Sequence, residues 1–337
     1  MAANVENMFS VRENVWHDPQ GEFTVANYPA DWDEARDLAG LNWEPVTTPA
    51  FTQTIVAGSD GMPEVTYEPV DNCNLVVRSD DGRVLGHVSP KWVPVQNKVL
   101  GEFAEALLDS TDATTRITTA GCIGDGEKVW LLIQLDEPYE MAGDDSLTYP
   151  YLVVQNSHDG TGAFQAAPTQ IRVVCQNTYD AATLAGERAG NMFKFRHTTN
   201  VMERVDEARR AITRVRDDVA QTREITSELA SIPASERAYL DFVSLLIPSP
   251  AEHGEQITDR VARNIEEARA KLDKVYRGSP TCDANRGTAL GLVHAGVEYL
   301  DHLRGYRNQT TRLNRTILTP ERAKARMVAQ AREACIA

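Results

Sequence analysis

Residues 75–88 read LVVRSDDGRVLGHV, and this stretch decides the fold of the first half of the chain. Two apolar runs flank Asp81-Gly82, and an Asp-Gly pair between such runs is a strong signal of a β-hairpin. Apolar residues at helical spacing follow between 97 and 109. A second hairpin is predicted from 116–122 and 128–135, and further strands at 149–155 and 170–175.

Helical patterns replace the strand patterns near residue 197. From Val201 to Val219 apolar residues recur at intervals of four and three, which indicates a heptad seam. Further helices are predicted at 236–247, 255–276 and 287–303, and one from Thr319. The fold class is therefore α+β, with an antiparallel β-rich N-terminal half containing one main helix and a helical C-terminal half. We divide it into an N-terminal arm with a short helix (1–40), an α+β core domain (41–196) and a helical domain or bundle (197–337).

The composition excludes several classes of protein. The chain has 337 residues and a net charge of −15, and it contains no apolar run long enough to span a membrane. Its start does not resemble a signal peptide, so we expect a cytoplasmic protein. Five scattered cysteines indicate reduced thiols. No phosphate-binding loop or clustered metal ligands occur, so no cofactor is expected.

The charge is unevenly spread. Residues 1–150 hold 8 Lys and Arg against 26 Asp and Glu, whereas 188–216 and 286–332 carry net charges of +5 and +6. In the first basic stretch aromatic residues alternate with cations, a pattern typical of single-strand binding by phosphate contacts and base stacking. Alternatively, these cations lie on solvated helix faces or pair with the acidic half. The residues predicted to contact nucleic acid are Lys194, Phe195, Arg196, Arg209, Arg210 and Arg214.

Two smaller constellations could carry chemistry. His158, Asp159, Cys175 and Asn177 contain the residue types of a thiol nucleophile with an oriented base. The alternative is a turn at His158 with Cys175 as a buried residue at the end of a strand. His158, His197 and His302, with Asp159 or Asp301, could hold a metal, but their spacing does not match a helical ligand pair. The pattern favours a structural role for both sets.

Several stretches resemble the phage/plasmid-like family called domain of unknown function 932. The resemblance spans about residues 40–330, in order, and implies a mobile-element context without a settled activity. It is carried by VSPKWVPVQN at 88–97, NSHDG at 156–160, RVVCQNT at 172–178, RHTTN at 196–200 and the stretch 287–302.

Three functions remain open at this point. The first is binding or annealing of single-stranded DNA, because the hairpin–helix–hairpin order at 72–135 is also similar to the core of phage annealing proteins of the Red-beta and RecT kind. Such proteins act as rings or filaments and need no covalent chemistry, which implies a homo-oligomer. The second is a non-enzymatic oligomeric interaction protein. The third, a thiol-dependent enzyme using Cys175, is the least favoured.

Overall fold

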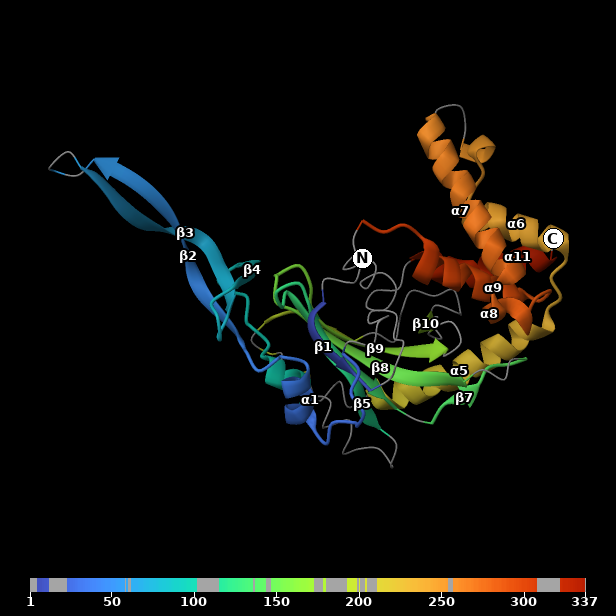
Figure 1. The fold of residues 1–337 in the computed structure, drawn as a ribbon, viewed down its shortest axis with the longest axis horizontal. Helices are drawn as coiled ribbons and strands as arrows, with labels where there is room; N and C mark the ends of the chain where they lie inside the picture. Colours follow the sequence, from blue (N-terminus) through green and yellow to red (C-terminus); the bar gives the residue numbers. More distant parts are fainter. Residues whose placement is uncertain are drawn as a thin grey trace.

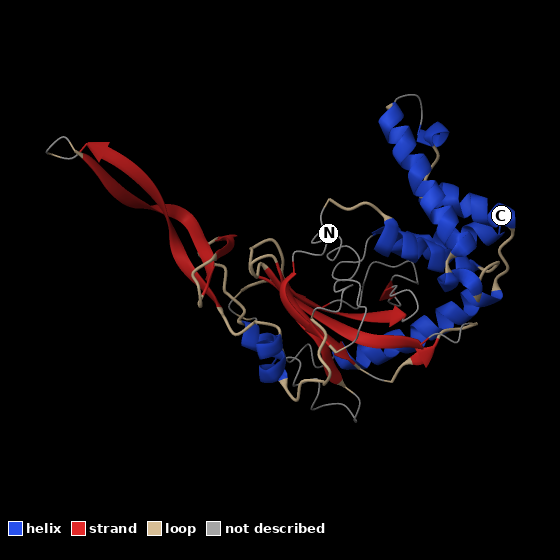
Figure 2. Ribbon diagram, viewed as in Figure 1, coloured by secondary structure: helices blue, strands red, loops and turns tan. Residues whose placement is uncertain are grey.

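The structure is a computed structural model, and it shows three parts: a long two-stranded ribbon, a central antiparallel sheet and a group of helices (Figures 1 and 2). This is the α+β arrangement predicted from the sequence, with strands in the first and middle parts and helices in the last. The described residues are 5–11, 23–57, 59, 62–101, 115–135, 137–143, 147–172, 178–179, 193–198, 200, 204, 211–253, 257–307 and 322–336.

The central sheet is antiparallel throughout, in the order β1-β5-β6-β8-β9-β10, with β7 beside β8 and β11 beside β9. The second predicted hairpin is present as its neighbouring strands β5 and β6. The strands are β1 (Val5–Ser10), β5 (Arg116–Ile123), β6 (Lys128–Gln134), β7 (Tyr139–Glu140), β8 (Leu147–Ser157), β9 (Phe164–Arg172), β10 (Thr178–Tyr179) and β11 (Phe193–Phe195).

Both faces of this sheet are covered, so β6 is buried along almost its whole length. Leu131 and Ile133 face a core that also contains Trp32 of helix α1 (Trp32–Leu38), whereas Trp130 faces a smaller cluster on the other side. The segment 1–40 was predicted to be an arm with a short helix. It supplies α1 as expected but also the strand β1, because its alternating residues Met8 and Phe9 enter opposite faces of the sheet.

The ribbon is formed by β2 (Pro45–Ala57) and β3 (Pro63–Arg78), and β4 (Val84–Val88) pairs only with the inner end of β3. The hairpin predicted at 72–89 is therefore present as β3 and β4. The outer part of the ribbon has two strands and no third neighbour among the described residues, and it projects away from the sheet (Figure 1). We call this outer part, residues 51–57 and 63–69, the β-arm.

The helices pack mainly on one another around a second core that includes Phe242, Leu272 and Leu292. The predicted helices from 236 onward are all present, with ends shifted by a few residues. Their bounds are α5 (Ala211–Ser231), α6 (Glu236–Leu246), the 3-10 helix η2 (Pro250–His253), α7 (Asp259–Gly278), α8 (Pro280–Asp283), α9 (Ala289–Glu298), the π-helix η3 (Tyr299–Leu303) and α11 (Arg322–Ile336). None of the described helices combines the length and the hydropathy that a membrane crossing requires.

Helix α5 joins the helical part to the sheet. It contacts α9 on one side and β9 on the other, where Gln170 Nε2 donates a 2.6 Å hydrogen bond to Thr222 Oγ1. Both side chains are buried. The helical half is therefore attached to the core through a buried polar contact as well as by the chain itself.

One glycine tests how tightly α1 packs. Gly101 lies on a helical turn at 97–101, and a Cβ added there would come within 1.5 Å of Trp32 Cδ1. Because Trp32 is buried, we expect Gly101→Ala to lower the free energy of unfolding by about 1–3 kcal/mol. The measurement is denaturant unfolding of the full chain.

The matched control is Gly278→Ala at the end of α7, where no atom lies within 4 Å of the added Cβ. It should keep or raise stability, by up to about 1 kcal/mol, since alanine loses less backbone entropy in a helix. Equal effects of the two substitutions would contradict the packing described for Trp32.

Candidate nucleic-acid interface and the junction beneath it

A buried polar junction lies where the base of the ribbon meets the central sheet. Its centre is a 2.9 Å hydrogen bond between His158 Nε2 and Asn97 Oδ1, and both side chains are fully buried. Asn97 Nδ2 donates to the carbonyl of Trp43 at 2.8 Å, so Asn97 Oδ1 is the acceptor and His158 Nε2 carries the proton.

The segment 93–97 is held on both sides of this bond. Asn156 Nδ2 donates to the carbonyl of Val95 at 2.9 Å, from the end of β8. On the other side, His197 Nδ1 donates to the carbonyl of Val93 at 3.1 Å, and the Val93 N–H donates to the carbonyl of His197. The junction therefore fastens three stretches, around 95, 157 and 197, that are distant in sequence.

Aromatic rings enclose both histidines. Trp43 meets His158 edge-on, with ring centroids 5.4 Å apart, and Trp92 stacks on His197 at 4.5 Å. The Arg78 guanidinium lies over the Trp43 ring, 4.6 Å from its centroid. A cation over an indole face is favourable, and more so when it is desolvated as Arg78 is.

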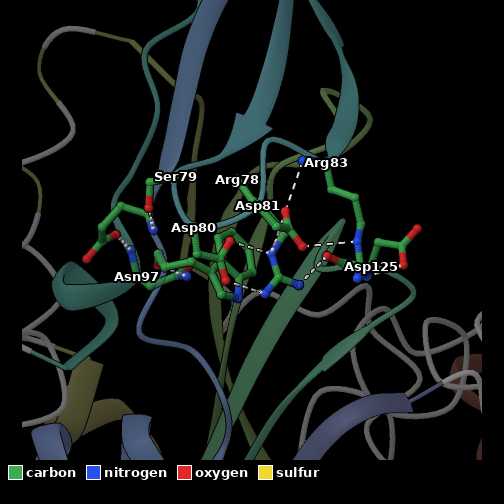
Figure 3. A network of polar contacts seen from close by, with 9 residues as sticks. Arg78, Ser79, Asp80, Asp81, Arg83, Asn97 and Asp125 are labelled. Atoms are coloured by element: carbon green, nitrogen blue, oxygen red, sulfur yellow. Dashed lines mark hydrogen bonds and ion pairs between the residues drawn. The ribbon is translucent and has the colours of Figure 1, made fainter.

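Arg78 also fixes the inner end of β3 (Figure 3). Its guanidinium binds both carboxylate oxygens of Asp80, at 3.0 and 2.8 Å, and donates to the carbonyl of Asp125 at 3.0 Å. The hydrogen bonds and charge of Arg78 lower the pKa of the Asp80 carboxyl. Arg83 adds a 2.8 Å ion pair to Asp125, so the turn after β3 is tied to the turn between β5 and β6.

Both histidines of the junction have depressed pKa values. Burial, together with a smaller repulsion of the charged form by the nearby His197, lowers the pKa of His158 to about 3. Burial likewise lowers the pKa of His197. Both rings are therefore neutral at neutral pH, and a base with a pKa near 3 is poorly matched to proton transfer there.

The junction also does not resemble a metal centre. His158 Nδ1 and His197 Nε2 are buried with no hydrogen-bond partner among the described residues. Yet the described part of the chain holds no group of three His, Cys, Asp or Glu side chains placed to share a metal ion. Asp301, the other ligand considered with His302, instead forms a buried ion pair with Lys324. The geometry favours a structural role for the junction.

Directly above the junction, β11 presents cations to solvent. Strand alternation points Lys194 and Arg196 outward and buries Phe195 and His197. No carboxylate of a described residue lies within ion-pair distance of Lys194 or Arg196. In the described sheet β11 is an edge strand, bonded only to β9. These two predicted site residues are thus brought side by side on an open edge.

Phe195 was predicted to stack on a base, but the structure places it in the core. Only 4% of its surface is exposed, and its ring stacks on Phe164. A ring buried in this way offers no face to a base. The exposed Arg204 extends its guanidinium over the same ring, 5.9 Å from the centroid, and so adds a cation beside β11.

Trp92 is the residue that sequence reasoning missed. Its ring stacks on His197, the residue packs against the main core but stays partly exposed, and the exposed Lys91 precedes it. Lys91-Trp92 belongs to the stretch 88–97 that carries the family resemblance, and nothing in its local pattern marks Trp92 as a site residue. Its proximity to Arg196 depends on the long-range bonds between 93 and 197, which no local pattern reveals.

The remaining predicted residues divide into two groups. Cys175, Asn177, Arg209 and Arg210 lie outside the described residues; Arg214 belongs to α5, but its side chain is also outside them. In the second basic stretch, Arg286, Lys324 and Arg332 form ion pairs with Asp283, Asp301 and Glu228. These three cations are therefore paired with acidic residues of the helical half itself, and not with the acidic N-terminal half that the alternative named.

The comparisons with known proteins define a family. The family model described as a domain of unknown function, DUF932, matches residues 84–318, so the chain belongs to this family. The match begins at the first residue of β4, and the ribbon strands β2 and β3 precede it. Neither the curated proteins nor the solved structures contain a match to the chain.

The depressed histidine pKa values predict acid sensitivity. A histidine of the unfolded chain binds a proton near pH 6.5, whereas His158 in the folded protein does so near pH 3. The contribution of the neutral His158 to the free energy of unfolding is therefore complete above pH 6.5 and is lost as the pH falls towards 3. We expect the loss to reach about 1.4 kcal/mol per pH unit for each such histidine. In His158→Gln the amide can still donate to Asn97. Between pH 6.5 and 5, the slope of its free energy of unfolding against pH should be smaller by the equivalent of one proton, about 1.4 kcal/mol per pH unit.

The measurement is the unfolding midpoint as a function of pH, in a range above the titration of most carboxyls. His87→Gln, at an exposed position of β4, is the control for loss of a histidine. An unchanged pH dependence in His158→Gln would show that His158 is accessible to protons in the folded protein.

Proposed function

We propose that this chain is a DNA-metabolism protein of a phage or plasmid that binds single-stranded DNA on the surface formed by β11 and residues 91–93. The observation that carries the proposal is the pair Lys194, on the edge strand β11, and Arg196, directly after it, both exposed without a carboxylate partner among the described residues. In this proposal the protein acts in the cytoplasm as a homo-oligomer and needs no covalent chemistry.

The surface supplies both interactions that a single strand requires. Lys194, Arg196 and Arg204 would neutralise phosphates, and the exposed part of Trp92 would stack on a base. Base stacking on an aromatic side chain contributes about 1–3 kcal/mol per base and does not depend on sequence. Binding would therefore be tolerant of base sequence.

The overall charge of −15 limits the mode of binding. A polyanion is repelled by the protein as a whole, and screening confines charge effects to about 8 Å at physiological salt. Only a local cluster of cations can then hold DNA. Asp159, the carboxylate that interacts with His197 beside this surface, already accepts hydrogen bonds from Ser157 Oγ at 2.5 Å and from the Thr161 N–H at 2.9 Å, which engages its negative charge.

Binding of a short oligothymidylate, followed by fluorescence anisotropy at several salt concentrations, tests the proposal. Each phosphate contact contributes about 0.7 to the slope of log K against log salt for a single strand. We expect Lys194→Gln with Arg196→Gln to weaken binding about tenfold and to reduce the slope by about 1.4. Trp92→Leu should weaken binding at least fivefold with an unchanged slope, because it removes stacking and not charge.

The matched control is Lys271→Gln with Lys274→Gln, which removes the same charge from exposed positions of α7. It should bind DNA as the natural chain does. Absence of binding by the natural chain at low salt, or equal weakening by both pairs of substitutions, would remove the proposal.

A further inference from the structure

The β-arm has one apolar and one polar face, and the apolar face is uncovered. Residues paired directly across an antiparallel ribbon lie on the same face, so the register Phe51↔Pro69, Gln53↔Tyr67, Ile55↔Val65 and Ala57↔Pro63 gathers these eight on one side. The pairs Thr52↔Glu68, Thr54↔Thr66 and Val56↔Glu64 form the other side.

The apolar face is more exposed than a soluble protein normally leaves such residues. Phe51, Ile55, Val65 and Tyr67 are 56, 67, 46 and 65% exposed. In the described part of the chain, seven of the seventeen exposed large apolar residues lie between 51 and 70. Contiguous apolar patches of this kind mark interaction sites, and an isolated two-stranded ribbon is only marginally stable in water.

The charges of the ribbon exclude nucleic acid as the occupant. From 45 to 77 the chain contains no Lys or Arg, but it contains Asp60, Glu64, Glu68 and Asp71. The strand carboxylates of Glu64 and Glu68 lie on the polar face, and the apolar face carries no charge. Its partner must therefore be an uncharged apolar surface.

We propose that the occupant is the β-arm of a second copy of this chain, with the two apolar faces packed against each other. The arm carries the densest group of exposed apolar residues in the described chain, so a second arm is the surface that best matches it. Two identical faces related by a twofold axis form a closed, self-complementary contact. The carboxylates of both arms then point outward, on opposite sides of a sandwich about 10 Å thick between sheets.

The size of this contact predicts its strength. The apolar face of one arm has two aromatic rings, those of Phe51 and Tyr67. Each brings on the order of 100 Å² to the contact, because complete burial of an aromatic side chain covers about 150–250 Å² and these rings are already partly covered. The arm contact is thus smaller than the roughly 800 Å² per partner of a standard interface. The dimer should therefore form and dissociate with protein concentration. This inference does not depend on nucleic-acid binding.

Sedimentation velocity of the full chain over a concentration series, without nucleic acid, tests the inference. The natural chain should shift from its monomer mass of 37.3 kDa towards twice that mass as concentration rises. Ile55→Lys should raise the dissociation constant at least tenfold. Thr54→Lys adds the same charge one residue away on the polar face, near Glu64 and Glu68, and should change it less than twofold.

A variant in which a short turn replaces residues 51–69 provides a second test, in which its association is measured alone and with the natural chain. Circular dichroism checks that the variant folds. It should stay monomeric and should not associate with the natural chain. Association with the natural chain would overturn the arm–arm contact, because the arm would then dock on the body of its partner. Salt also distinguishes the arm–arm contact from docking of the arm on the body of the partner. The apolar arm–arm contact should persist at high salt, whereas docking of an acidic arm on a basic surface would weaken.

A natural chain that remains a monomer at all concentrations would overturn the inference, as would equal effects of Ile55→Lys and Thr54→Lys. Neither result would bear on DNA binding itself, since the β-arm and β11 are separate surfaces with different residues, although a persistent monomer would also remove the homo-oligomer from the proposed function.

Discussion

The buried hydrogen bond between Asn97 and His158 fastens the base of the ribbon to the central sheet. Neither group can reach water, so loss of one partner would leave a buried polar atom unpaired at a cost of about 1–3 kcal/mol. Because Asn97 also bonds the chain at Trp43, and its neighbours in 93–97 bond Asn156 and His197, the base of the ribbon, the end of β8 and the segment after β11 hold one another in place.

This constraint also creates the candidate surface. With His197 fixed inside the junction, the strand period of two requires Phe195 to point inward and Lys194 and Arg196 to point outward. The same contact holds Trp92 against His197, and Trp92 stays partly exposed. The buried histidines therefore act as a rigid support, and their depressed pKa values are the result of the burial that makes the support rigid.

Local patterns predicted many of the elements, but they missed β1 and did not reveal the site. Asp81-Gly82 and the alternating runs beside it predicted β3 and β4, and helical spacing predicted α6, α7 and α9. The position of Phe195 was misjudged because alternation of basic and aromatic residues is typical both of a binding strand and of an edge strand with one face in the core. Trp92, and the ion pair of Lys324 with Asp301, depend on contacts between distant residues, so no local pattern could indicate them.

The distribution of charge separates the two proposed surfaces physically. A ribbon that has only carboxylates cannot bind a polyanion, and an apolar face without charge cannot discriminate by electrostatics. Conversely, the exposed side chains described beside β11, Lys194 and Arg196, are cations, and Phe195 is buried. If both proposals hold, an arm-mediated dimer carries two β11 surfaces on one particle. Each could be weak alone, because simultaneous engagement of one strand raises the effective affinity without any new contact.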